Sequence, residues 1–316
     1  MYQNFIGIDI SKATFVAAQH GLKQTHEFNN TQEGFDAFFQ HYNSVIPTSL
    51  VILETTGGYE MGLVQYLLTK GISVHRADTR KAKYFMRSLG KEAKSDNIDA
   101  LGLARYGYER HERLALYVAS SFHQEHLKQL SQRRLDLKQI MVQEKNRHQA
   151  PNQSACIQTS CQTMITALEA QLALVDAEIE ASIKAIPEQK ARQKILVEID
   201  GIGETISSAL LALLPELGRV DRKQIASLAG LAPHPCESGQ KVGYRRCKGG
   251  RQEVRSILFM AAMSASRSKG PLGQFYKDLL ARGKKKMVAL TALMRKIVVI
   301  ANAKLRDWDK EQMITT

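Results

Sequence analysis

The order of β-type runs and helical segments in about the first 110 residues constrains the fold most. Apolar or β-branched runs at 4–9 and 13–19, followed by an extended segment at 23–28, predict an antiparallel meander of three strands. Strands at 50–54 and 72–76 then alternate with helices that begin after Thr31 and at 61, 80 and 97. This is the order of the ribonuclease H fold, in which helices flank a sheet of mixed strand directions.

Four acidic residues stand at positions of this pattern where they can serve one metal site. Asp9 lies in the first apolar strand, and Glu54 ends the fourth strand before the turn TTGG. Asp96 and Asp99 lie three apart at a helix start that Ser95 can cap, and they therefore share a face. Taken singly, Asp9 can cap a turn and the aspartate pair can serve the helix dipole. Together the four predict an all-oxygen site for Mg²⁺ or Mn²⁺ that acts on phosphate.

A long helical region follows the predicted α/β part. Apolar residues form a stripe in 122–147, at Leu127, Leu130, Leu137 and Met141, and recur every three or four positions in 165–186. This predicts two antiparallel helices or a coiled coil. The two stripes can pack within one chain, but we favour a contact between subunits. The expected assembly is therefore a homo-oligomer, a dimer or a tetramer, held by this helical linker.

The last part of the chain predicts a compact helical domain. Two apolar segments flank Gly201 and Gly203, and helices joined by such a glycine turn can present backbone amides to a phosphate. The stretch 230–251 is rich in glycine, proline and basic residues and is expected to be a loop. Further helices are predicted at 252–268, 275–282 and 287–305.

The positive charge of the chain is concentrated in this last part. The net charge is +13 and the isoelectric point is near 9.5. Residues 191–316 hold 23 of the 44 basic residues but only 11 of the 31 acidic ones, and 241–286 holds 13 basic residues against two acidic ones. Such an imbalance indicates a surface that binds a polyanion through phosphate contacts, with a solvated basic face as the alternative.

The remaining composition narrows the class of protein. The four cysteines, Cys156, Cys161, Cys236 and Cys247, lack the spacing of a zinc site or a CxxC pair, and we expect free thiols. The opening apolar run is interrupted by Asp9, and no stretch has the length of a membrane span. We therefore expect a bacterial cytoplasmic protein that acts at the nucleoid and makes no contact with a membrane.

A series of motifs in fixed order gives a family resemblance. Over residues 4–267 the chain closely resembles the DEDD transposases of the insertion-sequence group that includes the pilin-gene inverting recombinases. The motifs are GIDISK, LETTGGYE, KSDNIDA, GIGETISSAL, GLAP and ESGQKVGYRRCKGGRQEVRSILFMAA.

The resemblance implies a domain plan and a set of site residues. It implies a RuvC-like catalytic domain at 1–112, a helical coiled-coil linker at 113–190, and a C-terminal transposase domain with a helix-hairpin-helix at 191–316. The family's metal-binding acids fall on Asp9, Glu54, Asp96 and Asp99, and its nucleophilic serine falls on Ser238. Many relatives carry two serines there, whereas this chain has Glu237, a negative charge, before Ser238.

The expected activity is site-specific recombination of DNA, by transposition or by inversion. Ser238 lies in a glycine-containing basic stretch, where a hydroxyl can attack a phosphate while cations stabilise the developing charge. A phosphoserine bond conserves the energy needed to rejoin strands. The resemblance also implies DNA and an element-encoded guide RNA as partners. Seven residues are predicted to contact nucleic acid: Gly201, Gly203, Lys241, Arg245, Arg246, Lys248 and Arg251.

Other interpretations of the sequence remain. A junction-resolving nuclease would use the same acids with water as the nucleophile, and a DNA-binding scaffold would use none of them. The motif GIDIS also resembles the first phosphate loop of sugar kinases and actin-like ATPases, but the further motifs of that superfamily are not visible. Finally, five cations from Arg76 to Arg87 can follow a nucleic-acid backbone, or they can form a solvated helix face. They are Arg76, Arg80, Lys81, Lys83 and Arg87.

Overall fold

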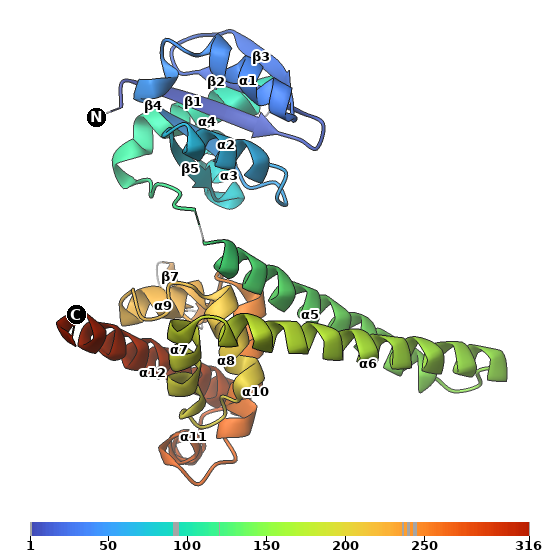
Figure 1. Cartoon of the computed structure of the whole chain (residues 1–316). Coiled ribbons are helices and arrows are strands. Elements are labelled where there is room, and N and C mark those ends of the chain that lie inside the picture. Colours follow the sequence, from blue (N-terminus) through green and yellow to red (C-terminus); the bar gives the residue numbers. More distant parts are fainter. Residues whose placement is uncertain are drawn as a thin grey trace. The chain divides into compact units, whose positions relative to one another are not determined.

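The computed structural model describes residues 2–90, 95–119, 121–235, 237–238, 241–242 and 245–315, with the backbone alone at 237–238, 241–242 and 315. The chain divides into two compact units, Met1–Ala119 and Ser120–Thr316. The N-terminal unit combines a sheet with helices, and the C-terminal unit is mainly helical (Figure 1).

One mixed sheet holds the strands of the N-terminal unit, which are β1 (Asn4–Ile10), β2 (Thr14–Gln19), β3 (Thr25–Asn29), β4 (Ser49–Glu54) and β5 (Ser73–Ala77). Their order is β3-β2-β1-β4-β5. β2 pairs antiparallel with both β1 and β3, so the predicted meander is confirmed. β4 pairs parallel with both β1 and β5. This mixed topology is compatible with a ribonuclease H-like sheet.

Helices cover both faces of the sheet, because alternate residues of each strand point to opposite sides. One face buries Ile6, Ile8 and Leu53 against the first two helices, and the other buries Phe5 and Ile52 against the next two. The helices are α1 (Gln32–His41), α2 (Met61–Thr69), α3 (Thr79–Ser88) and α4 (Asp96–Arg110), with short 3-10 turns at Ile46–Thr48 and His111–Arg113.

Two side-chain caps explain where α1 and α4 begin. The hydroxyl of Thr31 accepts a hydrogen bond from the backbone amide of Gly34, and the hydroxyl of Ser95 accepts one from the amide of Ile98. Serine and threonine are preferred at this position because they satisfy amides that have no partner within the helix. Both caps are as the sequence predicts.

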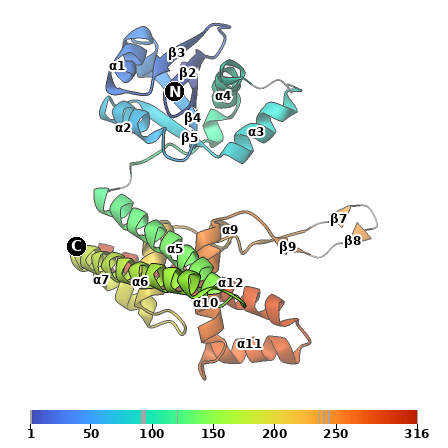
Figure 2. The same ribbon diagram turned by 90° about the vertical axis from the view of Figure 1, so that its right-hand side faces the viewer.

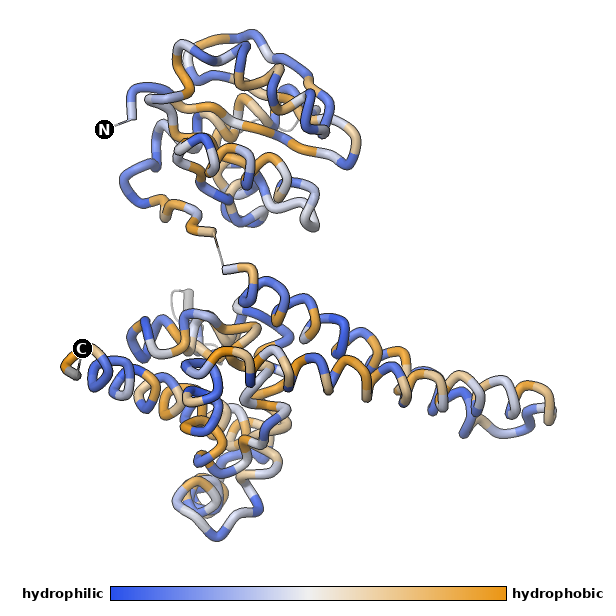
Figure 3. The backbone as a smooth tube through the Cα atoms, viewed as in Figure 1, coloured by the Kyte–Doolittle hydropathy of each residue, from blue (hydrophilic) through white to orange (hydrophobic). Residues whose placement is uncertain are grey.

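The C-terminal unit begins with a long helical hairpin, α5 (Phe122–His148) and α6 (Ala155–Lys184) (Figures 1 and 3). Its apolar stripes meet inside one chain, where Leu137 and Met141 pack against Leu168 and Leu172. The stripes are therefore satisfied without a second subunit. A contact between subunits through this hairpin would have to use other residues of the two helices.

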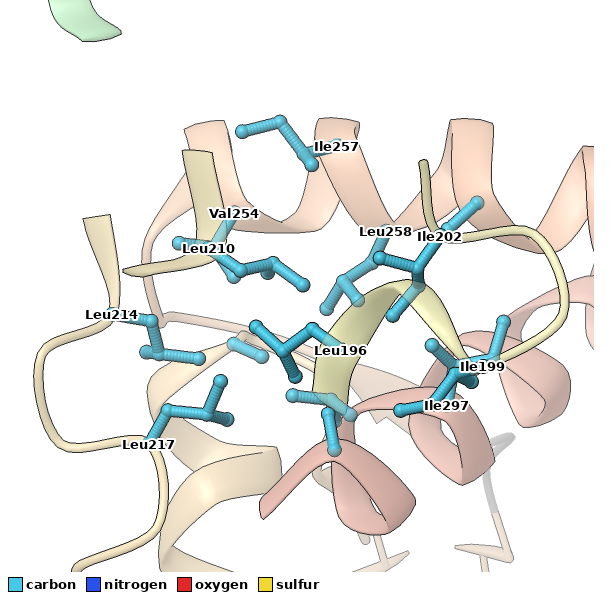
Figure 4. Close-up of a cluster of buried hydrophobic side chains, with 14 of the residues drawn as sticks. Leu196, Ile199, Ile202, Leu210, Leu214, Leu217, Val254, Ile257, Leu258 and Ile297 are labelled. Carbon is cyan, nitrogen blue, oxygen red and sulfur yellow. The ribbon is translucent and has the colours of Figure 1, made fainter. Parts of the chain in front are cut away.

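The rest of the C-terminal unit is a helical body around one apolar core. Leu196, Leu210, Leu258 and Ile297 come from four different helices and point into this core (Figure 4). The helices are α7 (Pro187–Val197), α8 (Glu204–Leu213), α9 (Arg222–Leu228), α10 (Gln252–Ala265), α11 (Pro271–Ala281) and α12 (Lys286–Thr315).

The structure corrects three expectations in this unit. Helix α9 is missing from the sequence prediction, and α12 continues ten residues beyond the predicted end at 305. The prediction of a loop over 230–251 is also wrong. Its extended pieces form two antiparallel pairs, because the glycines and prolines interrupt the stretch but leave short segments that can pair across it. The pairs join β6 (Pro233–His234) to β9 (Arg246–Cys247), and β7 (Glu237–Ser238) to β8 (Lys241–Val242).

Cys156, Cys161 and Cys247 are free thiols, and Cys236 lies outside the described residues. Across the described ranges, no helix combines the length and the apolar character that crossing a membrane requires.

Candidate active site

Asp9 and Glu54 lie side by side at one end of the sheet. β1 and β4 are parallel neighbours, and the last pair in their register is Ile8 with Leu53. Asp9 and Glu54 are the next residue of each strand, so they occupy adjacent positions at the carboxyl ends. Residues opposite each other on paired strands point to the same face, which here is the face that α3 and α4 cover.

Helix α4 brings the other two acids to the same place. A Cβ atom at Gly7 would stand 2.1 Å from the amide nitrogen of Ala104 and 2.2 Å from the carbonyl oxygen of Ala100, so α4 rests directly on the β1 backbone. A Cβ atom at Gly107, further along α4, would stand 3.5 Å from the ring of Phe5, which lies two residues nearer the start of β1 than Gly7. The helix therefore runs antiparallel to β1.

This direction places the first turn of α4 over the strand ends. Asp9 lies two residues beyond Gly7, a distance of about 6.6 Å along a strand. At about 1.5 Å per residue, the same distance along α4 covers roughly four residues from the Gly7 contact at 100–104. That step ends in the first turn, which carries Asp96 and Asp99. The backbone geometry thus directs all four predicted acids to one edge.

The electrostatics of Asp9 agree with this placement. Burial of the carboxyl group, followed by the charges of Asp99, Asp96 and Glu54, raises the pKa of Asp9 to about 6. A hydrogen bond with the backbone of Ile10 opposes the shift. Like charges close to one another disfavour ionisation, so the shift indicates that the four carboxylates act on one another.

The donor set suits a hard divalent cation. Carboxylate oxygens are the preferred ligands of Mg²⁺ and Mn²⁺, and a cation would offset the mutual repulsion at Asp9. Among the residues that the structure describes, no three histidine, cysteine, aspartate or glutamate side chains already stand close enough to hold an ion. Binding would therefore require these side chains to rotate toward one another.

A buried glutamate that the sequence analysis missed holds the turn after Glu54. Glu60 is fully buried, and its Oε2 atom accepts hydrogen bonds from the backbone amides of Thr56 (3.2 Å) and Gly58 (3.0 Å). Its Oε1 atom accepts a bond of 2.5 Å from Nη2 of Arg76 at the end of β5. Glu60 lies within the motif LETTGGYE, but only the fold shows that its carboxylate organises the turn.

Arg76 therefore differs from the other four cations of the predicted basic set, because its side chain is already bound within the N-terminal unit. Besides bonding to Glu60, its guanidinium group lies over the ring of Tyr117, with 5.1 Å from Cζ to the ring centroid. These contacts give Arg76 a structural role within the N-terminal unit. The other four cations of that set lie on α3, where the structure places them differently.

The predicted nucleophile lies in the C-terminal unit. Ser238 belongs to β7, where it is paired with Lys241 of β8, and Glu237 is paired with Val242. In Figure 2 this strand pair lies at the tip of an arm that projects from the helices. The side chains of Ser238 and Lys241 are outside the described residues. The backbone nevertheless places Ser238 beside a lysine of the basic stretch.

The two glycines of the turn between α7 and α8 have different surroundings. Gly201 has φ +87°, and a Cβ atom there would meet the carbonyl oxygen of Ala261 at 2.3 Å. Gly203 begins α8 as its N-cap, and a Cβ atom there would have no described atom within 4 Å. Gly201 is therefore required for packing on α10, while the backbone around Gly203 is open to a ligand.

The predicted cations of the arm fall into two groups. Arg245, Arg246 and Lys248 are exposed beside β9. Arg251 instead forms two bonds of 2.6 Å with the carboxylate of Glu216 and donates a third to the carbonyl oxygen of Leu213. A phosphate contact by Arg251 would have to replace these bonds.

Comparisons with known proteins cover both units. Residues 6–151 match a family described as "Transposase", and residues 193–277 match the "Transposase IS116/IS110/IS902 family". The chain is 32% identical to the "Pilin gene-inverting protein" of Moraxella bovis and 31% identical to that of Moraxella lacunata, over 97% of each chain in both cases. It is 30% identical to the "Insertion element IS116 uncharacterized 44.8 kDa protein" of Streptomyces clavuligerus, over 46% of this chain and 37% of that protein.

Proposed function

Because this chain belongs to the IS110 family of transposases, which includes the pilin gene-inverting proteins, it is a DNA transposase or recombinase, and we propose that it cuts and rejoins DNA through Ser238. The observation that carries this proposal is the shared edge of the sheet at which the backbone directs Asp9, Glu54 and the first turn of α4. The raised pKa of Asp9 supports it, because such shifts are frequent at catalytic sites.

The proposal includes a division of labour along the chain. We assign the acids to a RuvC-like catalytic domain at 1–112 and a linker role to 113–190. The segment 191–316 then forms the transposase domain, with a helix-hairpin-helix at Gly201 and Gly203. The mixed sheet and the glycine turn support these assignments.

Ser238 would exchange one phosphodiester bond for another. Its Oγ atom attacks the phosphorus, an Oγ–P bond forms, and one P–O bond of the DNA backbone breaks. The hydroxyl loses its proton, and the leaving oxygen of the DNA gains one to become a free hydroxyl. A DNA hydroxyl then attacks the phosphoserine in the reverse sense, so strands are rejoined without an external energy source.

Other residues of the chain would prepare this step. Asp9, Glu54, Asp96 and Asp99 would hold Mg²⁺ or Mn²⁺, which, when bound, supplies positive charge to the phosphoryl oxygens. The exposed cations Arg245, Arg246 and Lys248 would hold the DNA backbone beside Ser238. Glu237 places a negative charge next to Ser238 in the sequence, which would oppose formation of the serine alkoxide.

The comparison with the relatives favours inversion of a DNA segment as the reaction. The pilin gene-inverting proteins match along 97% of their length, whereas the IS116 protein matches along 37% of its own. Inverted segments in the DNA next to this reading frame would support inversion, and structured noncoding ends would support transposition with a guide RNA. A homo-oligomer, dimeric or tetrameric, is part of the proposal.

Covalent trapping tests the proposal. A labelled, nicked DNA substrate incubated with the protein and Mg²⁺ should give an adduct on a denaturing gel, and Ser238→Ala should abolish it. Ser256→Ala is the matched control, because that hydroxyl donates to the carbonyl oxygen of Gln252 within α10. Active protein that cuts DNA without an adduct would refute the serine mechanism and favour hydrolysis by water, as in a junction-resolving nuclease.

A further inference from the structure

Helix α3 has one apolar face and one basic face. Ala82 and Phe85 are buried against the sheet together with the partly buried Met86 and Leu89. At 3.6 residues per turn, the opposite face carries Arg80, Lys83, Tyr84 and Arg87, and Lys81 flanks it. All five of these residues are exposed, and the helix contains no acidic residue.

The four cations of this face have no acidic partner within the described residues. No ion pair or hydrogen bond engages the charged ends of the Arg80, Lys81, Lys83 or Arg87 side chains there. The Asp78 carboxylate before the helix instead accepts hydrogen bonds from the backbone amides of Arg80 and Lys81 as the helix cap. The neighbouring cations behave differently: Arg76 bonds to Glu60, and Arg105 bonds to Glu109. The positive charge on α3 is therefore available to an anion from outside this unit.

Short contacts fix α3 beside the candidate acids. Ala77, the last residue of β5, is paired with Glu54. Two residues later the hydroxyl of Thr79 donates to the carbonyl oxygen of Thr55 at 3.2 Å, and it also lies 3.2 Å from the Thr55 hydroxyl. At its other end α3 contacts α4, where a Cβ atom at Gly102 would meet Sδ of Met86 at 2.9 Å.

We propose that the basic face of α3 holds the phosphate backbone of one DNA strand and leads that strand to the carboxylates of Asp9 and Glu54. This inference rests on the proposed function. An α-helix of ten residues is about 15 Å long, the axial length of roughly four nucleotides of one strand in duplex DNA. Four cations over that length match the spacing of the phosphates. The exposed ring of Tyr84 between them can pack against a sugar or an unstacked base.

The salt dependence of DNA binding by the full-length protein tests the inference. On duplex DNA, log K falls as log salt rises, and each lost phosphate contact reduces the magnitude of this slope by about 0.9. Lys83→Gln should lower it by about that amount, and the triple variant Arg80→Gln, Lys83→Gln, Arg87→Gln by about 2.7. These side chains are exposed, so the thermal unfolding midpoint should stay unchanged.

A matched control lies on the opposite face of the same sheet. Lys70 stands over the rings of Phe39 and Tyr66, 5.6 Å from each centroid, and Lys70→Gln should leave the slope unchanged. The triple variant should cut DNA more slowly at low DNA concentration and regain the wild-type rate at saturation.

The possible outcomes separate this inference from the proposed function. A slope that stays at the wild-type value in the triple variant would overturn the role of α3, even while the protein still traps DNA through Ser238. A change that appears with single-stranded RNA but not with DNA would overturn it as well. If the wild-type protein neither binds nor cuts DNA, the proposed function fails first.

Discussion

Glu60 and Arg76 form an ion pair beneath the turn that follows Glu54, with 2.5 Å between Oε1 and Nη2. The glutamate is fully buried, and only 25% of the arginine side chain is exposed. The same carboxylate binds the amides of Thr56 and Gly58. One side chain therefore fixes both the end of β5 and the turn beside a candidate metal ligand.

Breaking this pair should destabilise the protein and slow DNA cleavage. Glu60→Gln leaves the Arg76 guanidinium without its charged partner, and loss of one member of a buried pair costs about 3 kcal/mol. Urea denaturation at pH 7 measures this loss. Glu109→Gln, which removes the exposed pair with Arg105, should change stability little. Equal effects of the two substitutions would show that the Glu60 pair has no special structural role.

The same pair should make stability depend on pH. Burial raises the pKa of Glu60, but bonds from its own backbone, from Arg76 and from Thr56 outweigh burial, so the pKa lies below its ordinary value. An acid with a depressed folded pKa stabilises the protein above its unfolded pKa, near 4.3, and loses that contribution as pH falls through the folded value. Between pH 6 and pH 3, wild-type stability should therefore fall more steeply than that of Glu60→Gln. If urea denaturation shows that the stabilities of the wild type and Glu60→Gln change with pH in parallel, this prediction is wrong.

Gly7→Ala should disturb the acid site by pushing α4 away from β1. The added methyl group would lie 2.1 Å from the amide nitrogen of Ala104, so α4 has to move away from β1. We expect a loss of about 2–4 kcal/mol in the free energy of unfolding, together with loss of cleavage. Gly62→Ala is the control, because its methyl group would meet only the edge of the Phe35 ring at 3.3 Å. Unchanged stability of Gly7→Ala would argue against the close contact of α4 with the sheet.

Features with local causes could be predicted from the sequence. Apolar runs predicted the strands that carry Asp9 and Glu54, and Thr31 and Ser95 marked helix starts through their own hydroxyls. Asp9 and Glu54 lie together because β1 and β4 are neighbours in the sheet, and the order of strands and helices along the sequence leaves few other strand orders. These predictions depend on residues that are close in sequence or on the spacing of apolar residues, and both can be read from a single sequence.

Features that depend on distant partners could not be predicted. Nothing next to Glu60 in sequence indicates that β5 brings Arg76 to it, and nothing next to Arg251 indicates Glu216, 35 residues away. The pairs β6–β9 and β7–β8 contain two residues per strand, which is too short for an alternating pattern to appear. In each case the deciding interaction joins segments that the sequence separates.

Asp9→Ala should abolish cleavage while DNA binding remains. The acids are expected to hold the catalytic cation, whereas binding depends on cations elsewhere in the chain. Removal of divalent ions with a chelator should have the same effect on wild-type protein, and Mg²⁺ or Mn²⁺ should restore cleavage. Asp36→Ala is the control, since that carboxylate accepts a bond from Tyr66 on α1's side of the sheet. Cleavage that survives both the substitution and the chelator would exclude Asp9 from the mechanism.

Arg251 and Arg246 should respond differently to substitution, although both belong to the same basic stretch. Arg251 joins the start of α10 to Glu216 and Leu213, so Arg251→Ala should lower the free energy of unfolding by about 1–2 kcal/mol. Arg246 is exposed on β9, so Arg246→Ala should leave unfolding unchanged and weaken DNA binding with a smaller salt slope. Thermal unfolding and filter binding on both variants separate the two roles. If Arg251→Ala weakens DNA binding at full stability, its bonds to Glu216 give way to phosphate when DNA binds, and the arginine belongs with the DNA-binding cations after all.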